Sequence, residues 1–241
     1  MASAPRVPGV REAVRPALVD LYHHSIRFVP VNLAWGLGLI GLLSLATVGA
    51  PLVALILAPL LALPLVGMAR MAGEVARGRD VVLADAWDAV RELAIPAVVA
   101  GALGIIAMVV LAGNVLLGLG TGTVPAIAIA VAAGWGLVAL ALVALPFWVL
   151  LADPERADRG LVGAAADAAA LFLVEPVRLL ALTAVVAVVL VVGTVLVAAI
   201  LTVAVAYAVL VTARVVVPAG DRLAGPPDVT SLGDGPGDRA R

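Results

Sequence analysis

The stretch LAIPAVVAGALGIIAMVVLAGNVLLGLGTGTVPAIAIAVAAGWGLVALALVALPFWVLLA occupies residues 93–152 and decides the fold. It contains no Asp, Glu, Lys or Arg over its sixty residues. A helix needs about 20 apolar residues to cross the roughly 30 Å hydrocarbon core of a bilayer, so this stretch has room for two spans. Residues 118–123 read Gly-Leu-Gly-Thr-Gly-Thr and precede Pro125, which is the pattern of a loop between two helices.

Two further runs, 28–69 and 179–213, also lack charged residues. Across the chain 64% of residues are hydrophobic and 13% are charged, with a mean hydropathy of +1.19. A soluble domain has about a quarter of its residues charged, so this composition excludes an ordinary water-soluble fold. Turn signals interrupt the runs at residues 49–51 (Gly-Ala-Pro) and 193–194 (Gly-Thr). We therefore predict an all-α polytopic membrane protein whose six transmembrane helices form three hairpins, with spans near 31–49, 52–70, 95–116, 126–150, 179–195 and 197–217.

The third run allows two arrangements. As a single helix it is about 52 Å long at about 1.5 Å per residue, which exceeds the hydrocarbon core. Two helices fit if the turn is tight and the apolar stretch extends to about Val217. Many valines favour strands in water, but an open sheet edge in lipid leaves backbone groups without hydrogen bonds, so helices are favoured. Six spans are preferred, and the alternative is five spans plus a tilted or re-entrant piece within 179–217.

The charged residues give the orientation. All 15 basic residues are arginines, and they lie in blocks outside the three uncharged runs. Three hairpins place every block on the same side, and short loops that carry arginine stay cytoplasmic. We expect a multi-pass protein of the bacterial cytoplasmic membrane with both termini inside the cell. Residues 1–29 form the N-terminal cytoplasmic segment, residues 30–217 the membrane domain, and residues 218–241, rich in Gly, Pro and Asp, a disordered tail.

A helical segment followed by a proline precedes each predicted hairpin. These segments have apolar residues on one face, which is typical of helices that lie in the headgroup region. The proline allows the chain to turn sharply into the bilayer. The segments cover about 16–28, 80–94 and 159–174, and the prolines are Pro30, Pro96 and Pro176.

The sequence argues against several classes of function. The chain has no cysteine, which excludes disulfides and cysteine-ligated metal sites, and its net charge of −1 gives no field for nucleic acid. The only histidines, His23 and His24, are adjacent, so on a helix they point about 100° apart and make a poor shared metal site. No catalytic motif is present, so we expect neither an enzyme nor a cofactor. The three uncharged runs contain no carboxylate, histidine or arginine, which argues against ion-coupled transport.

A few residues are candidates for contact with a neighbouring helix or a partner. Asn32 lies three residues before Trp35 on one helix face, where its amide bonds either a neighbouring helix or another protein. The loop at 70–92 mixes charges of both signs, a composition that suits docking to a protein, although a solvated helix has the same pattern. Within it Asp88 is placed to pair with Arg91. The candidate contact residues are Asn32, Trp35, Asp85, Trp87, Asp88, Arg91, Glu92 and Arg178, and the candidate helix breaks are Pro59, Pro64 and Pro146.

The order of short motifs resembles a known family. Asn32-Leu-Ala-Trp35 begins the first span, residues 46–51 (Ala-Thr-Val-Gly-Ala-Pro) make the first turn, and residues 69–80 (Ala-Arg-Met-Ala-Gly-Glu-Val-Ala-Arg-Gly-Arg-Asp) lead to residues 85–91 (Asp-Ala-Trp-Asp-Ala-Val-Arg). Leu145-Pro-Phe147 and Glu175-Pro-Val-Arg178 follow. Over about residues 27–217 the chain resembles the YesL-like family of bacterial integral membrane proteins. It departs from the family pattern at Glu175, where asparagine is expected, and at Ala50, which separates the glycine and proline of the turn.

That family has no established biochemical activity. Its members resemble genes found beside carbohydrate-uptake systems, so the resemblance implies an accessory role in sugar import. The leading interpretation is a non-enzymatic accessory or scaffold component whose partners are the lipid bilayer and a sugar-transport complex or other membrane protein. The alternative is a transporter or channel for a neutral small solute, which needs a polar-lined path past Pro59 and Pro64. Stripes of small residues serve internal packing and oligomerisation equally, so the oligomeric state stays open.

Overall fold

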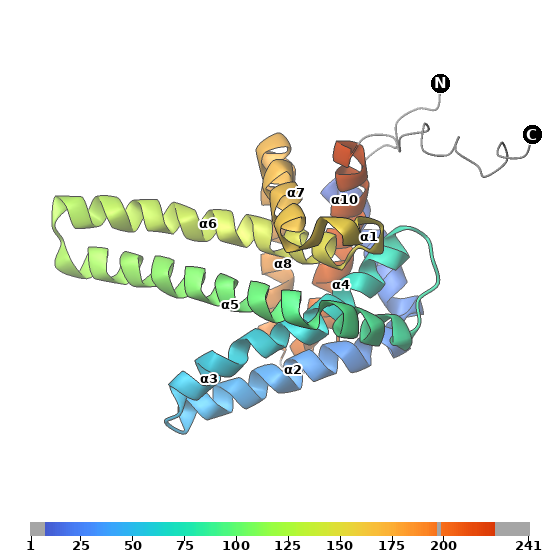
Figure 1. Ribbon diagram of the computed structural model, residues 1–241, viewed down its shortest axis with the longest axis horizontal. Helices are drawn as coiled ribbons and strands as arrows, with labels where there is room; N and C mark the ends of the chain where they lie inside the picture. Colours follow the sequence, from blue (N-terminus) through green and yellow to red (C-terminus); the bar gives the residue numbers. More distant parts are fainter. Residues whose placement is uncertain (1–7, 197–198, 225–241) are drawn as a thin grey trace, which may run out of the picture.

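The computed structural model describes residues 8–196 and 199–224, and within these ranges the chain is helical without a strand (Figure 1). This confirms the predicted all-α class. The elements, in chain order, are α1 (Val10–His23), α2 (Ser25–Thr47), α3 (Pro51–Leu57), the 3₁₀ turn η1 (Ala58–Leu61), α4 (Ala62–Ala76), α5 (Leu83–Thr121), α6 (Val124–Ala152), the 3₁₀ turn η2 (Pro154–Arg159), α7 (Gly160–Val174), α8 (Pro176–Val195), the π-helical turn η3 (Ile200–Ala204) and α10 (Val205–Ala224).

Six of the helical segments in the described part of the chain are long and apolar enough to cross a membrane. They make the protein a multi-pass membrane protein, as the composition predicts. The segments are Ser25–Thr47, Pro51–Ala76, Leu83–Thr121, Val124–Ala152, Pro176–Val195 and Thr202–Ala224. The third run of sequence thus supplies two separate helices, each of spanning length.

The turns of the first two hairpins form where the glycines predict them. Gly49, with φ +93°, follows the end of α2, and Pro51 begins α3. Gly122, with φ +65°, separates α5 from α6. Only glycine adopts a positive φ at little cost, so these two residues allow the chain to reverse within a few residues. The loop at 118–123 is shorter than predicted, because α5 continues to Thr121.

The α5–α6 hairpin extends from the rest of the molecule as an arm (Figure 1). Helix α5 has 39 residues, about 58 Å at about 1.5 Å per residue, whereas α2 has 23. The two helices of the arm pack closely at Gly118, whose position leaves no room for a side chain against Ala126 and Ala130. Most large apolar side chains of the arm face outward, as expected for surfaces in lipid.

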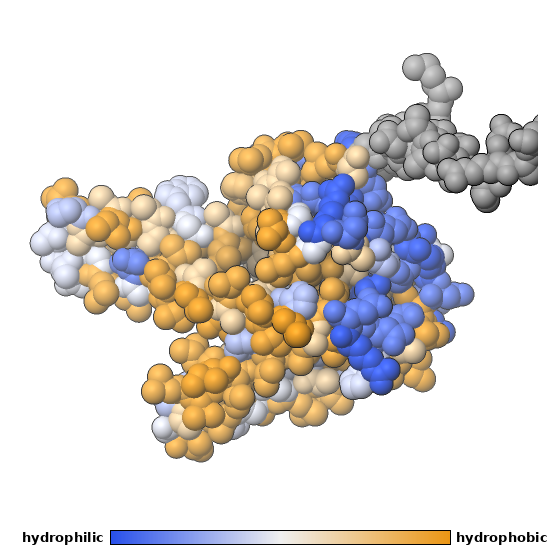
Figure 2. All heavy atoms as spheres, in the orientation of Figure 1, coloured by the Kyte–Doolittle hydropathy of each residue, from blue (hydrophilic) through white to orange (hydrophobic). Residues whose placement is uncertain are grey.

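Helix α10 forms the centre of the body. It contacts α1, α4, α6 and α8, and most of its residues from Val205 to Gly220 are buried. Figure 2 shows hydrophilic residues gathered at the end of the molecule where α1 and the beginning of α5 lie, while hydrophobic residues cover the two hairpin arms. The molecule therefore has one polar end and an apolar remainder, the pattern that a bilayer imposes.

Two of the three predicted proline boundaries are wrong. Pro30 lies inside α2 and Pro96 lies inside α5, and both helices continue through them. Proline removes one backbone hydrogen bond, and packing in a membrane protein tolerates that loss. The segment predicted at 80–94 is therefore the first part of the spanning helix α5 and not a separate helix. At Pro176 the prediction is correct, since α7 ends at Val174 and α8 begins at Pro176.

The chain ends also differ from the prediction. The first helix covers Val10–His23 instead of 16–28, and His24 separates it from α2. Residues 218–224, predicted as the beginning of a disordered tail, continue α10 because Asp221 and Arg222 form ion pairs there. The rest of that predicted tail, 225–241, and residues 1–7 lie outside the described residues.

Candidate functional site

Asn32 joins two helices in the membrane body. Its side chain is fully buried, and its Oδ1 accepts a hydrogen bond of 2.8 Å from the backbone N–H of Ala206. The π-helical turn η3 immediately precedes this amide, and such turns depart from the regular i→i−4 pattern. Asn32 therefore supplies an acceptor where the helix geometry is irregular. Trp35 is half-buried and packs against the core beside it.

The candidate contact residues at the beginning of α5 differ in their roles: some hold the fold together and others make no such contact. Asp85 caps the helix, because its Oδ2 accepts a 2.7 Å hydrogen bond from the N–H of Val82. Glu92 binds Arg70 of α4 at 2.6 Å. Of these candidate residues, Asp88, Trp87 and Arg91 neither cap the helix nor form an ion pair with another helix, and all three are exposed.

Arg91 does not pair with Asp88, contrary to the sequence prediction. Its guanidinium lies over the ring of Trp87, 5.2 Å from the centroid, in a cation–π contact. The side chain thus folds back one helical turn toward the polar end. Arg178, the last predicted contact residue, pairs with Glu175 at the beginning of α8.

A network of ion pairs joins the helices at the polar end of the molecule. It was not among the features predicted from the sequence. Arg77, just after α4, makes a two-pronged contact with Asp153 at the end of α6, with both N···O distances at 2.7 Å. The side chain of Asp153 is 0% exposed and that of Arg77 is 11% exposed. A planar guanidinium matched to a carboxylate in this way is among the strongest hydrogen-bonded pairs in proteins.

A second arginine extends the network to the third hairpin. Arg156 in η2 binds Asp167 of α7 at 2.9 Å and Asp221 of α10 at 3.0 Å. Asp221 also lies 3.4 Å from Arg77. The network therefore connects the polar ends of α4, α6, α7 and α10, which belong to all three hairpins.

The charges around Arg77 raise its pKa. Burial alone lowers the pKa of a guanidinium, but the hydrogen bond and charge of Asp153, with the charges of Asp221 and Glu155, outweigh that effect. Arg77 is consequently cationic at every physiological pH. The network is a permanent link and not a proton switch at this residue.

Two signals in the sequence point toward this network. Asp153 is followed by Pro154 where a spanning helix ends, and Asp167 stands almost alone among apolar residues of its helix. An isolated carboxylate in an apolar segment indicates a buried partner. The identity of the partners was not predictable, because Arg77 and Asp153 are 76 residues apart.

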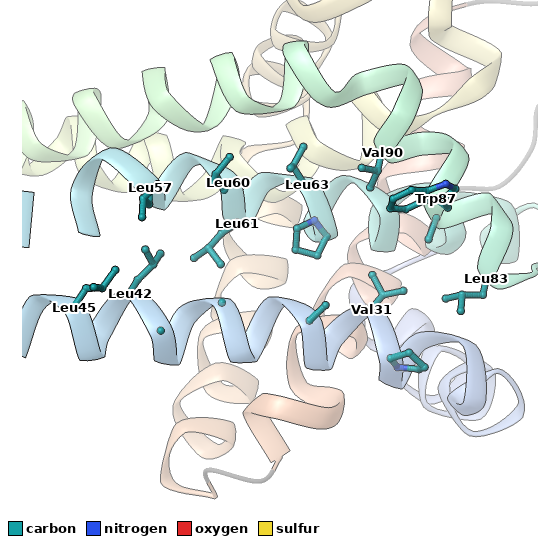
Figure 3. Close-up of a pocket in the computed structure, with 16 residues that line it drawn as sticks. Val31, Leu42, Leu45, Leu57, Leu60, Leu61, Leu63, Leu83, Trp87 and Val90 are labelled. Atoms are coloured by element: carbon teal, nitrogen blue, oxygen red, sulfur yellow. The ribbon is translucent and has the colours of Figure 1, made fainter. Parts of the chain in front are cut away.

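An apolar groove of about 800 Å³ lies between the first hairpin and the beginning of α5 (Figure 3). Its walls come from α2, from the α3–η1–α4 segment and from α5, and they consist only of Leu, Val, Ala, Gly, Pro and Trp. Pro59 lies in η1, where the segment leaves the α-helical form, and Pro64 lies in the groove wall. Pro146, by contrast, is buried inside an uninterrupted α6.

The described residues hold no candidate metal site, and the comparisons with known proteins find no match. Among residues 8–196 and 199–224, no group of three or more His, Asp or Glu is arranged to hold a metal ion. His23 Nδ1 contacts the carbonyl of Val19, and His24 Nδ1 contacts Arg27. Comparisons with protein-family models, with curated proteins and with solved structures each give no match.

Proposed function

We propose that this integral membrane protein is a non-enzymatic accessory or scaffold component that binds a partner membrane protein. The observation that carries the proposal is the ion-pair network at the polar end. It links all three hairpins through side chains that are largely buried, Asp153 and Arg156 above all. Breaking a buried ion pair costs about 3–5 kcal/mol, so the network holds the hairpins as one rigid body.

Rigidity of this kind favours a scaffold over a carrier. Alternating access requires one part of a transporter to rock against another around a central site. The alternative function, transport of a neutral solute, also needs polar groups along the path. The groove beside Pro64 has an apolar wall throughout, which suits hydrocarbon better than a sugar.

The beginning of α5 is the docking surface that we propose. Trp87 is 57% exposed, and Asp88 beside it is exposed without a structural role in the described contacts. Tryptophan next to unpaired charge is typical of residues that anchor protein interfaces. The resemblance to YesL-like proteins suggests that the partner belongs to a carbohydrate-uptake system.

Affinity purification of the full chain in mild detergent tests this proposal. We expect a transport protein to co-purify with the native chain. Asp88→Arg reverses an exposed charge without touching the helix cap or the Arg70 contact, and it should reduce the recovered partner several-fold. Asp158→Arg is the matched control, since Asp158 is an exposed carboxylate of η2 on another hairpin.

Two results would contradict the proposal. One is recovery of the chain always alone, and the other is equal loss of the partner in both variants. A solute flux through vesicles that contain only this protein would favour the transporter instead.

A further inference from the structure

We propose that the apolar groove holds an acyl chain of a phospholipid whose phosphate binds between Arg27 and Arg91. At the end of the groove nearest the beginning of α5, Leu83 and Trp87 lie opposite Val31 of α2 (Figure 3), and Pro30 also lines the groove. This inference does not depend on the proposed scaffold function.

The groove has the dimensions of one acyl chain. Along α2 its wall runs from Pro30 to Leu45, which is about 22 Å at about 1.5 Å per residue. One leaflet of hydrocarbon is about 15 Å thick, half of the bilayer core. The groove therefore reaches from the headgroup region through one leaflet. Its volume of about 800 Å³ lies within the range of sites that enclose a ligand of lipid size.

Hydrocarbon is the occupant that its walls favour. An ordered water needs two to four polar partners, and the side chains that line the groove offer a single hydrogen-bonding group, the indole N–H of Trp87. Gly38 and Gly41 lie in the α2 wall, where a Cβ at Gly38 would lie 2.8 Å from Leu61 Cδ2. A Cβ at Gly41 would meet no atom within 4 Å, so the space beside it is empty of protein.

Two arginines are neighbours in sequence of residues that line the polar end of the groove. Arg27 precedes Val31 and Ala34 by four and seven residues, which places it on the helix face that lines the groove, one turn nearer the polar end. Arg91 follows groove residue Val90, and its guanidinium folds back over Trp87, itself a groove residue. Long cationic side chains extend toward the headgroups in this manner.

Neither arginine is neutralised within the described part of the chain. Arg70 and Arg214, by contrast, each have a carboxylate partner, Glu92 and Asp20. Arg27 contacts only the ring nitrogen of His24, and Arg91 contacts only the Trp87 ring. A phosphodiester between two guanidinium groups satisfies both, since arginine binds phosphate oxygens through paired N–H donors.

Native mass spectrometry of the full chain tests the inference. The protein is reconstituted with dioleoyl phosphatidylglycerol, and dioleoylglycerol serves as the probe with the same chains and no phosphate. We expect one phospholipid retained per chain, with clear preference over dioleoylglycerol. Arg27→Gln and Arg91→Gln should each reduce retention roughly tenfold, and Gly41→Leu, which fills the groove, should abolish it.

Matched controls distinguish a specific loss of lipid binding from misfolding of the variants. Arg15→Gln removes an exposed arginine of α1 outside the groove, and Gly104→Leu adds the same side chain to α5 where a Cβ would meet nothing within 4 Å. Both should retain the phospholipid as the native chain does. Equal retention of the two probes, unchanged retention in Gly41→Leu, or a co-purified peptide in place of lipid would overturn the inference. Loss of lipid with the partner still bound would leave the scaffold proposal standing.

Discussion

At the scale of single residues, buried polar side chains connect parts of the chain that are far apart in sequence. Asn32 contacts Ala206, and Asp153 contacts Arg77. The sequence indicated that the Asn32 amide bonds either a neighbouring helix or another protein, since an amide inside a span needs a partner. It could not indicate which helix, because the partner is a backbone N–H and any residue type supplies one.

Replacement of Asn32 tests its role as a link between α2 and α10. Asn32→Ala removes the acceptor for the buried Ala206 N–H, and we expect a loss of about 1–2 kcal/mol in the free energy of unfolding. The measurement is equilibrium unfolding in mixed detergent. Asn114→Ala is the control, since Asn114 bonds the Val110 carbonyl of its own helix and is half-buried. Equal losses in the two variants would show that the hydrogen bond between α2 and α10 stabilises the fold no more than a hydrogen bond within one helix does.

Replacement of Asp153, the buried carboxylate of the network, should lower the free energy of unfolding more than replacement of Asn32. Asp153→Asn leaves the Arg77 guanidinium without its two-pronged partner, with an expected loss of about 3–5 kcal/mol in unfolding free energy. Glu155 also contacts Arg77, but its side chain is 52% exposed. Glu155→Gln should therefore cost less than about 1 kcal/mol. A ranking with Glu155→Gln as the more damaging variant would refute this view of the network.

The contribution of Arg77 to the free energy of unfolding should not change with pH in the physiological range. Its pKa is higher in the folded chain than in the unfolded chain, so its stabilising effect is present below the unfolded value and is lost only as the pH rises through the folded value. We expect the difference in unfolding free energy between the native chain and Arg77→Gln to stay constant from neutral pH to about pH 10. A decrease of that difference within this range would contradict the raised pKa.

At the scale of secondary-structure elements, the hairpins depend on close helix contacts. In the α5–α6 arm, a Cβ at Gly118 would lie 2.3 Å from the Ala126 carbonyl oxygen and 2.7 Å from the Ala130 Cβ. Contacts that short force the backbones apart. The glycines were assigned to a loop from their density in the sequence, and Gly118 instead lies within a helix, because close packing requires glycine as often as a turn does.

A single methyl group should therefore distinguish two neighbouring glycines. Gly118→Ala is expected to lower the free energy of unfolding by about 1–3 kcal/mol, since the new methyl group overlaps α6. Gly120→Ala meets no atom within 4 Å and should change it by less than about 0.5 kcal/mol. Unfolding of both variants in the same detergent mixture measures the contrast. Equal stabilities of the two variants would mean that α5 and α6 do not pack closely at Gly118.

At the scale of the whole molecule, charge and hydropathy determined most of what was predictable. Runs without charge predicted the six helices of spanning length, and glycines predicted the turns of the first two hairpins. The third turn, predicted at Gly193–Thr194, is wrong, because both residues lie inside α8. The proline boundaries failed at Pro30 and Pro96 because packing tolerates proline inside a long helix. The groove and the partners within the ion-pair network were not predictable, since both form only where separate hairpins meet.

The central claim is that a bilayer sorts the chain into three hairpins whose charged ends share one side. The chain has no cysteine, so single cysteines can be placed at will. Val48→Cys and Thr123→Cys report on the hairpin turns, and Asp80→Cys and Glu155→Cys report on the connections between hairpins. With a membrane-impermeant maleimide on intact cells, we predict labelling of the first two positions and protection of the last two. Labelling of a turn and a connection from the same side would contradict the account.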